Sequence, residues 1–296
     1  MQKIIPHLWF DKEAKQAAEF YVATFGKGSN IKTLSQLDNT PSGSVDLVSF
    51  ELLGLEFQAI SAGPLFKFNP SVSFNVTCTS RADVDVIWEK LSEGGTALME
   101  LGSYPFSERY GWVQDRYGLS WQIFYSGAAD VKPKIIPGLM FVGNVAGKAE
   151  EAINFWTALF PESKIDMIQR RGKGEEPEKE GSVRYAAFSL LSQEFRAMDS
   201  ALEHRFAFNE AISFIVKCNT QEEIDYYWNK LSAVPEAEQC GWLKDQYGFS
   251  WQIVPTTMDE MMKAGNPEQI ARVTEAFLQM KKFDIESLER AYQMQR

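Results

Sequence analysis

Residues Gly111–Ile123 read GWVQDRYGLSWQI, and residues Gly241–Ile253 read GWLKDQYGFSWQI. Nine of the thirteen positions are identical, among them two tryptophans and a glutamine. In each stretch an Asp-x-Tyr-Gly turn, with its glycine in the left-handed position, separates two segments of strand character. The chain therefore contains one strand–turn–strand unit twice, which indicates a longer internal repeat around it.

The repeat extends through most of the chain. KIIP, AAEFYVATF, SFNVTC and WEKLS in the first half recur in the same order as KIIP, AINFWTALF, SFIVKC and WNKLS in the second half. We interpret residues 1–126 and 134–254 as two copies of one domain, joined by the short polar linker SGAADVKP. Residues 255–296 change in character and predict a helical tail.

Each copy contains the same order of elements twice. In the first half-copy a strand at 4–10 leads to an amphipathic helix at about 12–25, and three strands follow at 30–36, 45–52 and 55–61. A strand at 71–78 and a helix at 82–91, capped by Ser80 or Thr79, then restart the pattern. The sequence therefore predicts an α+β fold of tandem βαβββ modules.

Composition excludes several classes of function. The chain has 296 residues, 45% of them hydrophobic, and a formal net charge of −10. No Lys/Arg cluster resembles a phosphate-binding stripe, so we expect neither nucleic acid nor a membrane as a partner. We find no signal-peptide pattern or membrane-spanning run, which favours the cytoplasm. The three cysteines have no metal spacing, and we expect Cys78 and Cys218 to be buried.

The module order resembles that of the vicinal oxygen chelate superfamily, also called glyoxalase/bleomycin-resistance/dioxygenase. Within it, IIPHLWF, WEKLSEGG, GWVQDRYGLSWQIF and MKKFDIESLERAY resemble the PhnB-like branch. The resemblance covers nearly the whole chain. Its members are often labelled 3-demethylubiquinone-9 3-methyltransferase. The chain lacks the glycine-rich loop with a following acidic residue by which Rossmann-like folds hold an adenosine cofactor, so we do not expect methyl transfer.

The resemblance implies that a pair of modules curls into a cup, and that metal-using relatives place metal ligands on four inward positions of it. The matching positions are His7, Gln58, Ser73 and Gln122 in the first copy, and Gly138, Arg196, Ser213 and Gln252 in the second. Neutral amides and hydroxyls are poor ligands for a divalent cation, and an arginine repels one. We therefore expect no metal and no cofactor.

The alternation of side chains along each strand sorts inward from outward residues. It directs Ser73, Asn75 and Gln122 into the cup, while Trp121 and Trp251 pack under helices. His7 is interpreted as a hydrogen-bonded strand histidine, as a ligand-binding residue or as a metal ligand. Gln122 and Gln252 are interpreted either as paired amides that organise the cup or a domain interface, or as ligand-binding residues. Trp9 is interpreted either as a pocket wall or as core. The candidate ligand-binding residues are His7, Trp9, Gln58, Ser73, Asn75, Gln122, Arg196, Ser213 and Gln252.

The two copies are not equal. Leu91 and Trp112 are 21 positions apart, whereas Leu231 and Trp242 are 11 apart, so the second copy lacks most of one strand. If a single copy binds a ligand, we favour the first.

In the tail we expect three helices: a short one with a capping box of Thr257 and Glu260, one opened by the cap Asn266 and running to about 282, and a last one at 285–292 capped by Asp284. An apolar stripe of Ile270, Val273, Phe277 and Met280 predicts that the tail docks on the domains, with a homodimer contact as the second interpretation.

Three functions remain open on this basis. The first is metal-independent binding of a small molecule in a cup, with the two copies pairing within the chain as single-domain relatives pair between chains. The second is a metal-dependent lyase, isomerase or oxygenase, which would need a different ligand such as Glu56 in place of Gln58. The third is the methyltransferase of the family label. Whether the chain is an enzyme stays open, because fold does not determine function.

Overall fold

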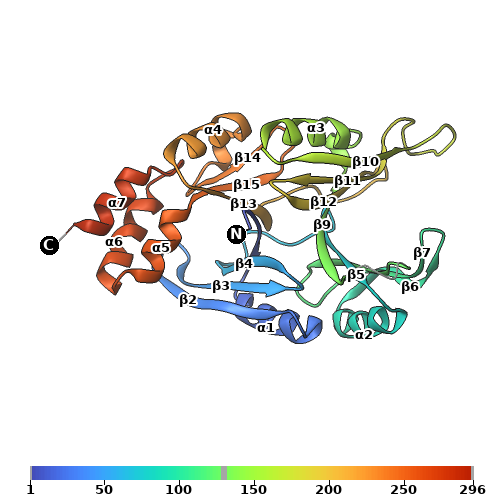
Figure 1. The fold of residues 1–296 in the computed structure, drawn as a ribbon, viewed down its shortest axis with the longest axis horizontal. Coiled ribbons are helices and arrows are strands. Elements are labelled where there is room, and N and C mark those ends of the chain that lie inside the picture. The colour runs from blue at the N-terminus through green and yellow to red at the C-terminus, as the bar shows by residue number, and fades with distance from the viewer. Residues whose placement is uncertain (1, 128–131, 295–296) are drawn as a thin grey trace.

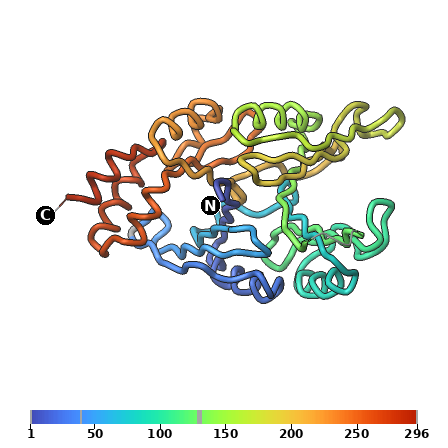
Figure 2. Tube along the Cα trace, viewed as in Figure 1, coloured from blue at the N-terminus to red at the C-terminus, as the bar shows by residue number. Residues whose placement is uncertain are grey.

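The computed structural model describes residues 2–127 and 132–294, so part of the predicted linker lies outside the described residues. The chain forms four strand–helix–strand modules followed by three helices, as the sequence predicts (Figure 1). The N-terminal strand lies in the middle of the molecule, and the C-terminal helices form one end of it (Figure 2).

The first copy contains two complete βαβββ modules. The first consists of β1 (Ile4–Phe10), α1 (Ala14–Phe25), β2 (Asn30–Thr40), β3 (Gly43–Leu52) and β4 (Leu55–Ser61). The second consists of β5 (Val72–Cys78), α2 (Arg81–Ser92), β6 (Thr96–Tyr104), β7 (Ser107–Gln114) and β8 (Ser120–Tyr125). Of the two predicted caps for α2, Ser80 is the one that accepts from the backbone N–H of Asp83.

The second copy is complete in its first module and shortened in its second. The third module consists of β9 (Lys134–Phe141), a 3₁₀ turn η1 (Gly143–Val145), α3 (Ala149–Leu159), β10 (Lys164–Arg170), β11 (Val183–Leu190) and β12 (Gln193–Asp199). The fourth consists of β13 (Ile212–Cys218), α4 (Gln221–Leu231), η2 (Pro235–Ala237), β14 (Trp242–Lys244) and β15 (Ser250–Pro255). In the described residues a 3₁₀ turn stands where β6 stands in the first copy, which confirms the predicted loss of a strand.

Each of the two sheets combines strands from both copies of the domain. The seven-stranded sheet has the order β14-β15-β13-β1-β4-β3-β2, and the eight-stranded sheet has the order β10-β11-β12-β9-β5-β8-β7-β6. Antiparallel ladders between β1 and β13 and between β5 and β9 join the copies. The expectation that each copy closes its own cup is therefore wrong, because the first module shares a sheet with the fourth, and the second with the third.

Each sheet packs its outer face under helices, with α1 and α2 on one side of the molecule and α3 and α4 on the other (Figure 1). Trp121 and Trp251 are at most 1% exposed, which confirms that they belong to the core. The two Asp-x-Tyr-Gly turns are confirmed as turns, with Gly118 and Gly248 at φ of 85° and 75°.

The aspartate of each turn has a structural role that the sequence did not reveal. Asp245 is 1% exposed, and its carboxylate accepts from Trp156 Nε1 at 3.0 Å, Trp251 Nε1 at 2.9 Å and two backbone N–H groups of its own turn. Asp115 repeats the arrangement with Tyr21 Oη at 2.8 Å and Trp121 Nε1 at 2.9 Å. Each aspartate thus links the two modules of one copy, on the helix-covered side of the sheets.

The tail comprises α5 (Thr256–Ala264), α6 (Pro267–Leu278) and α7 (Ile285–Gln293). The predicted caps of α6 and α7 are confirmed, since Asn266 forms a capping box with Gln269 and Asp284 accepts from the N–H of Ser287. The predicted capping box of Thr257 is wrong, because α5 continues directly from β15 and begins one residue earlier. No helix in the described part of the chain is long and apolar enough to cross a membrane.

The tail docks beside the shortened fourth module. Its predicted apolar stripe packs into the core, with Val273 fully buried and Phe277 8% exposed. The backbone N–H groups of Cys240 and Gly241 donate to the carbonyls of Met280 and Lys281, just before β14. The segment after α6 therefore satisfies backbone groups beside β14, where the first copy uses its own strand β6.

We expect Gly241→Ala to loosen this docking. Gly241 has a φ of +83°, and a Cβ atom there would lie 2.5 Å from the Phe283 ring and 3.0 Å from the carbonyl oxygen of Ile253. The combined strain and overlap should lower the free energy of unfolding by about 2–3 kcal/mol in urea titrations. Gly248→Ala is the matched control, because Gly248 has a φ of +75° but open space around a Cβ. Equal losses in the two variants would contradict the proposed docking role of Gly241.

Candidate functional site

The seven-stranded sheet brings together predicted site residues from both copies. The ladders pair His7 with Gln58 on β4 and with Ser213 on β13. Gln252 on β15 donates to Ser213 Oγ at 2.9 Å. We call the inward face around these residues the seven-stranded cup, defined by His7, Gln58, Ser213 and Gln252.

His7 lies deep in this cup in its neutral form. Its side chain is 7% exposed, and the edge of its ring meets Trp242, with the ring centroids 5.3 Å apart. Burial, with the nearby Lys217 ammonium, lowers the pKa of His7 to about 3. Its Nδ1 atom is buried without a hydrogen-bond partner in the described structure. A neutral imidazole with an unused nitrogen can serve a ligand as donor or acceptor.

Trp9 lies on the same face of β1 as His7, two residues further along the strand. Its indole N–H donates to the carbonyl of Gly63 at 2.8 Å, and its ring lies edge-on to Trp242 and Phe66 at 6.0 and 5.1 Å. Trp9 as a whole is partly exposed, which is compatible with either of the two interpretations, pocket wall or core.

Helix α5 closes one end of the seven-stranded cup. Lys217 follows Ser213 along the inward face of β13, and its side chain is 6% exposed. Its ammonium reaches Asp259 of α5 at 2.6 Å. A buried charge paired in this way is held firmly, because separating the pair would leave the ammonium without a partner.

The eight-stranded sheet gathers the remaining predicted residues in a second cup. The ladders place Arg196, Gly138 and Ser73 side by side on β12, β9 and β5, and place Asn75 beside Gln122 on β8. Gln122 donates to Ser73 Oγ at 2.7 Å and accepts from Tyr110 Oη at 2.8 Å. We call this face the eight-stranded cup, defined by Ser73, Asn75, Gln122, Gly138 and Arg196.

Gly138 on β9 is equivalent to His7 on β1. Because Gly138 has no side chain, the side chain of Asn75 can fill the space beside it. A Cβ atom on Gly138 would lie 2.3 Å from Asn75 Nδ2. The amide of Asn75 therefore occupies the space into which a first-strand histidine would project, and it donates to the carbonyl of Ile136 at 3.3 Å. The eight-stranded cup thus presents amides, a hydroxyl and a guanidinium, with no imidazole at its predicted positions.

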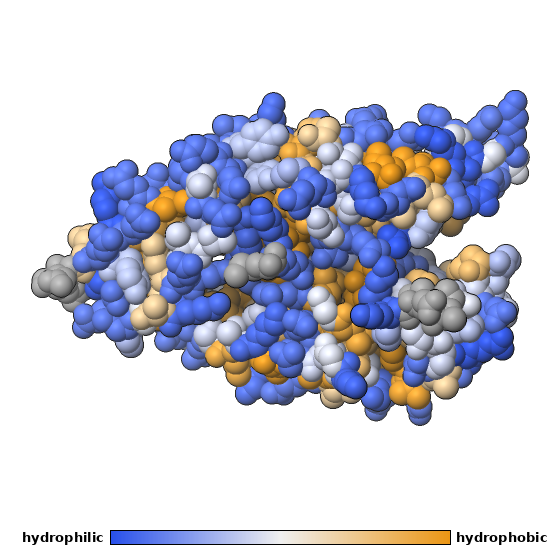
Figure 3. All heavy atoms as spheres, viewed as in Figure 1, coloured by the Kyte–Doolittle hydropathy of each residue, from blue (hydrophilic) through white to orange (hydrophobic). Residues whose placement is uncertain are grey.

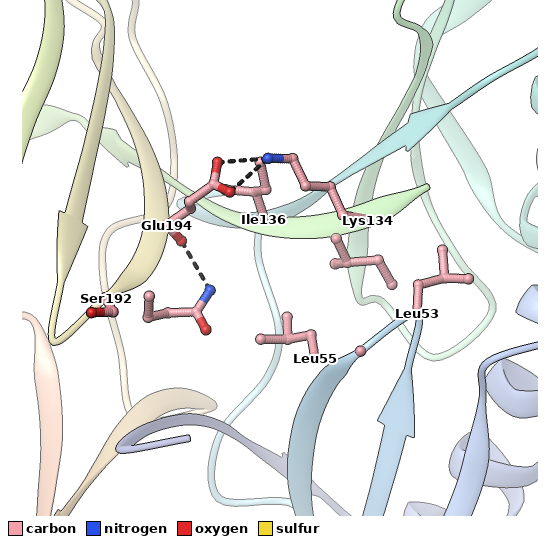
Figure 4. Close-up of a pocket in the computed structure, with 9 residues that line it drawn as sticks. Leu53, Leu55, Lys134, Ile136, Ser192 and Glu194 are labelled. Carbon is pink, nitrogen blue, oxygen red and sulfur yellow. Dashed lines mark hydrogen bonds and ion pairs between the residues drawn. The ribbon is translucent and has the colours of Figure 1, made fainter. Parts of the chain in front are cut away.

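A pocket of about 180 Å³ lies beside the eight-stranded cup, where the first residues of β9 and β12 meet the β3–β4 hairpin of the other sheet. Lys134 and Ile136 precede Gly138 on the inward face of β9, and Glu194 precedes Arg196 on β12. Lys134 Nζ meets both Glu194 oxygens, at 2.6 and 2.8 Å, opposite Leu53 and Leu55 of the β3–β4 hairpin (Figure 4). The lining residues are Leu53, Gly54, Leu55, Lys134, Ile135, Ile136, Ser192, Gln193 and Glu194.

The outer end of this cup is open and rich in aromatic side chains. Figure 3 shows a notch between the β10–β11 and β6–β7 ends of the molecule. Tyr185 of β11 is 38% exposed, and Phe106 of the β6–β7 turn is 67% exposed beside a second pocket of about 270 Å³. The Phe106 ring packs edge-on against Tyr110, which holds Gln122.

Sequence reasoning missed the aromatic wall residues other than Trp9. Trp112 and Trp242 lie directly beside Gln122 and Gln252 in the two hairpins, on the inward face. The opening motif contained this signal, because in a hairpin with a short turn the first tryptophan pairs with the glutamine across the turn. The strand alternation that sorted β8 could equally have placed Tyr110 and Trp112 of β7 in the cup.

No described group of three or more His, Cys, Asp or Glu side chains is arranged to hold a metal ion. Cys78 and Cys218 are buried as predicted, and burial raises the pKa of each thiol to about 12. Ser200 Oγ and His204 Nε2 lie 3.0 Å apart, a proximity the sequence could not show. Glu178 contacts the serine rather than the imidazole, and Ser200 is 3% exposed, so the geometry of a catalytic triad is not formed.

The fold and the inward positions define a tandem duplicate of the glyoxalase-like fold. Glyoxalase I from Zea mays shares that fold at 12% sequence identity, with a TM-score of 0.53 over 87% of this chain and 94% of that one. At this level of identity the likeness concerns the fold alone.

The family follows from the sequence model that matches both copies. The model described as 3-demethylubiquinone-9 3-methyltransferase matches residues 2–124 and 133–254, and the chain belongs to this PhnB-like family. The PhnB protein of Bacillus cereus is 38% identical, with a TM-score of 0.40, and the match covers 42% of this chain and 100% of that one. No curated protein sequence matches the chain.

Proposed function

We propose that the chain binds a small organic molecule in a β-sheet cup without a metal ion. The observation that supports this most directly is the chemistry at the chelating positions. In both sheets the glutamine amide is hydrogen-bonded to a serine hydroxyl, at 2.9 and 2.7 Å, and the single histidine there is neutral. Aromatic walls with a few fixed polar groups are typical of small-molecule sites.

The metal-dependent alternative has weaker support. It needs a carboxylate in register with His7, and Glu56 was the candidate. The β1–β4 ladder pairs His7 with Gln58, while Glu56, two residues earlier on β4, forms an ion pair with Lys32. In the other sheet Arg196 would repel a cation at the equivalent position. Methyl transfer, the activity in the family's name, has no adenosine-binding loop to support it.

The eight-stranded cup is the better candidate for the site. Its walls carry exposed Tyr185 and Met167, whereas α5 lies at one end of the seven-stranded cup, where its half-exposed Asp259 pairs with the buried Lys217. The preference for the first copy has to be revised, because each cup takes residues from both copies. A cytoplasmic location and a homodimer through the exposed faces of the tail remain predictions.

We expect ligands to stabilise the metal-free chain, which can be measured by thermal-shift screening of a metabolite library after chelator treatment. A hit should raise the melting temperature with no metal detected by elemental analysis. Gln122→Leu should abolish the shift because it removes the Ser73–Gln122–Tyr110 hydrogen bonds, while Gln252→Leu, its twin in the other sheet, should retain it. Hits that survive both substitutions, or that depend on added metal, would refute the proposal.

A further inference from the structure

We infer that the eight-stranded cup takes a small aromatic carboxylate, with the guanidinium of Arg196 as its anchor. The inference rests on the proposed function and specifies its ligand class. Three features near Arg196 support it: the local charge, the unused N–H donors of the guanidinium and the aromatic side chains nearby. None of them requires a metal ion.

Where β9 and β12 begin, the cup carries more positive than negative charge. Lys134 and Arg196 share a single carboxylate, because Glu194 is the acidic partner of both, at 2.6 and 3.3 Å. One negative charge between two positive charges leaves a surplus cation facing the cup, although the whole chain has a net charge of −10. A local surplus of this sign attracts an anion and disfavours a cation.

Arg196 still has donors to offer. A guanidinium has about five N–H donors in a planar fork. In the described structure Arg196 uses Nη1 for the carbonyl of Phe195 at 3.0 Å and Nη2 for Glu194 at 3.3 Å. The contact with Glu194 is long, and that carboxylate is already held by Lys134 at shorter distance, so an incoming carboxylate can compete for the fork.

The surroundings favour a planar aromatic body on that carboxylate. The guanidinium carbon of Arg196 lies 6.0 Å from the ring centroid of Tyr185 on one wall, and Tyr110 and Trp112 flank Gln122 on the other. Aromatic walls bind flat apolar bodies well.

Isothermal titration of the metal-free full-length chain with benzoate tests the inference. We expect saturable binding of benzoate, and binding about 10- to 100-fold weaker for benzamide, which has the same shape without the charge. Cyclohexanecarboxylate should also bind more weakly because it is not planar. Inorganic phosphate should not compete, since it lacks the aromatic body.

Arg196→Gln should weaken benzoate binding by about the same 10- to 100-fold. Arg196→Lys, which keeps the charge but not the fork, should recover part of the affinity. Arg170→Gln is the matched control, because it removes one exposed positive charge from β10 of the same sheet. A melting curve for each variant will show that it is folded.

Benzoate binding that is unchanged in Arg196→Gln, or equal binding of benzoate and benzamide, would overturn the inference. If the neutral probe binds equally and its binding is lost in Gln122→Leu, the proposed function stands without the anion anchor. Absence of benzoate binding to the unsubstituted chain also overturns the inference, and the library screen then decides the proposed function independently.

Discussion

Replacing Asp245 by alanine should lower the free energy of unfolding by about 3–5 kcal/mol, the largest effect we expect from a single substitution. The carboxylate is 1% exposed and accepts from the indoles of Trp156 and Trp251 and from two backbone N–H groups. Without it, four donors in a buried layer lose their partner at once. Equilibrium urea denaturation at neutral pH measures the effect.

Asp115→Ala should cost a similar amount, because Asp115 holds Tyr21 and Trp121 in the same way. Glu236→Ala serves as the control, since Glu236 lies exposed in η2, and it should change stability by no more than about 0.5 kcal/mol. A loss below about 1 kcal/mol in both aspartate variants would contradict a structural role for the buried carboxylates.

Replacing His7 by asparagine should reduce the loss of folding stability that occurs as the pH is lowered. Burial lowers the pKa of His7 to about 3 in the folded chain, whereas an unfolded histidine titrates near its ordinary 6.5. Between these values the unfolded chain binds more protons, so stability falls as the pH drops below 6.5. The loss from this one group approaches about 1.4 kcal/mol per pH unit, or about 2 kcal/mol between pH 6.5 and 5.

The measurement compares the native chain and His7→Asn by urea denaturation at several pH values. The difference between them should shift in favour of the variant by about 2 kcal/mol from pH 6.5 to 5. Burial also raises the pKa of Asp115 and Asp245 to about 6, so these two groups stabilise the folded chain as the pH falls. Both chains contain them, so their contribution cancels in the difference. Gln252→Leu, a neighbour that does not titrate, should show a constant offset. A pH-independent difference for His7→Asn would show that the histidine is accessible to protons in the folded chain.

Sequence predicted the modules well because their signals are local. The repeats fixed the order of elements, and strand alternation separated Trp121 and Trp251 in the core from Ser73 and Gln122 in the cup. The pairs of amide and hydroxyl follow from the same alternation, because facing residues of neighbouring strands lie within hydrogen-bond reach.

The pairing of modules could not be predicted in this way. The strands β5 and β13 read SFNVTC and SFIVKC over residues 73–78 and 213–218, so either presents β1 with nearly the same edge. The side-chain pattern of a strand specifies its register and which of its faces is buried. It does not choose between two partner strands of equal pattern, such as β5 and β13, because that choice depends on the geometry of the whole chain. The contact between Trp242 and His7 could not be predicted for a related reason, since the two residues come from opposite ends of the sequence.

The exchange of strands between the copies has a consequence for how the two cups can diverge. In a symmetric pair of identical short chains, every substitution appears in both sites, so neither can lose an interaction that the other needs. Fusion into one chain removes that constraint: Gly138 and Arg196 line one cup, while His7 and Gln58 stand at the equivalent positions of the other. One site can then specialise in recognition while its twin, braced by the C-terminal helices, serves as scaffold.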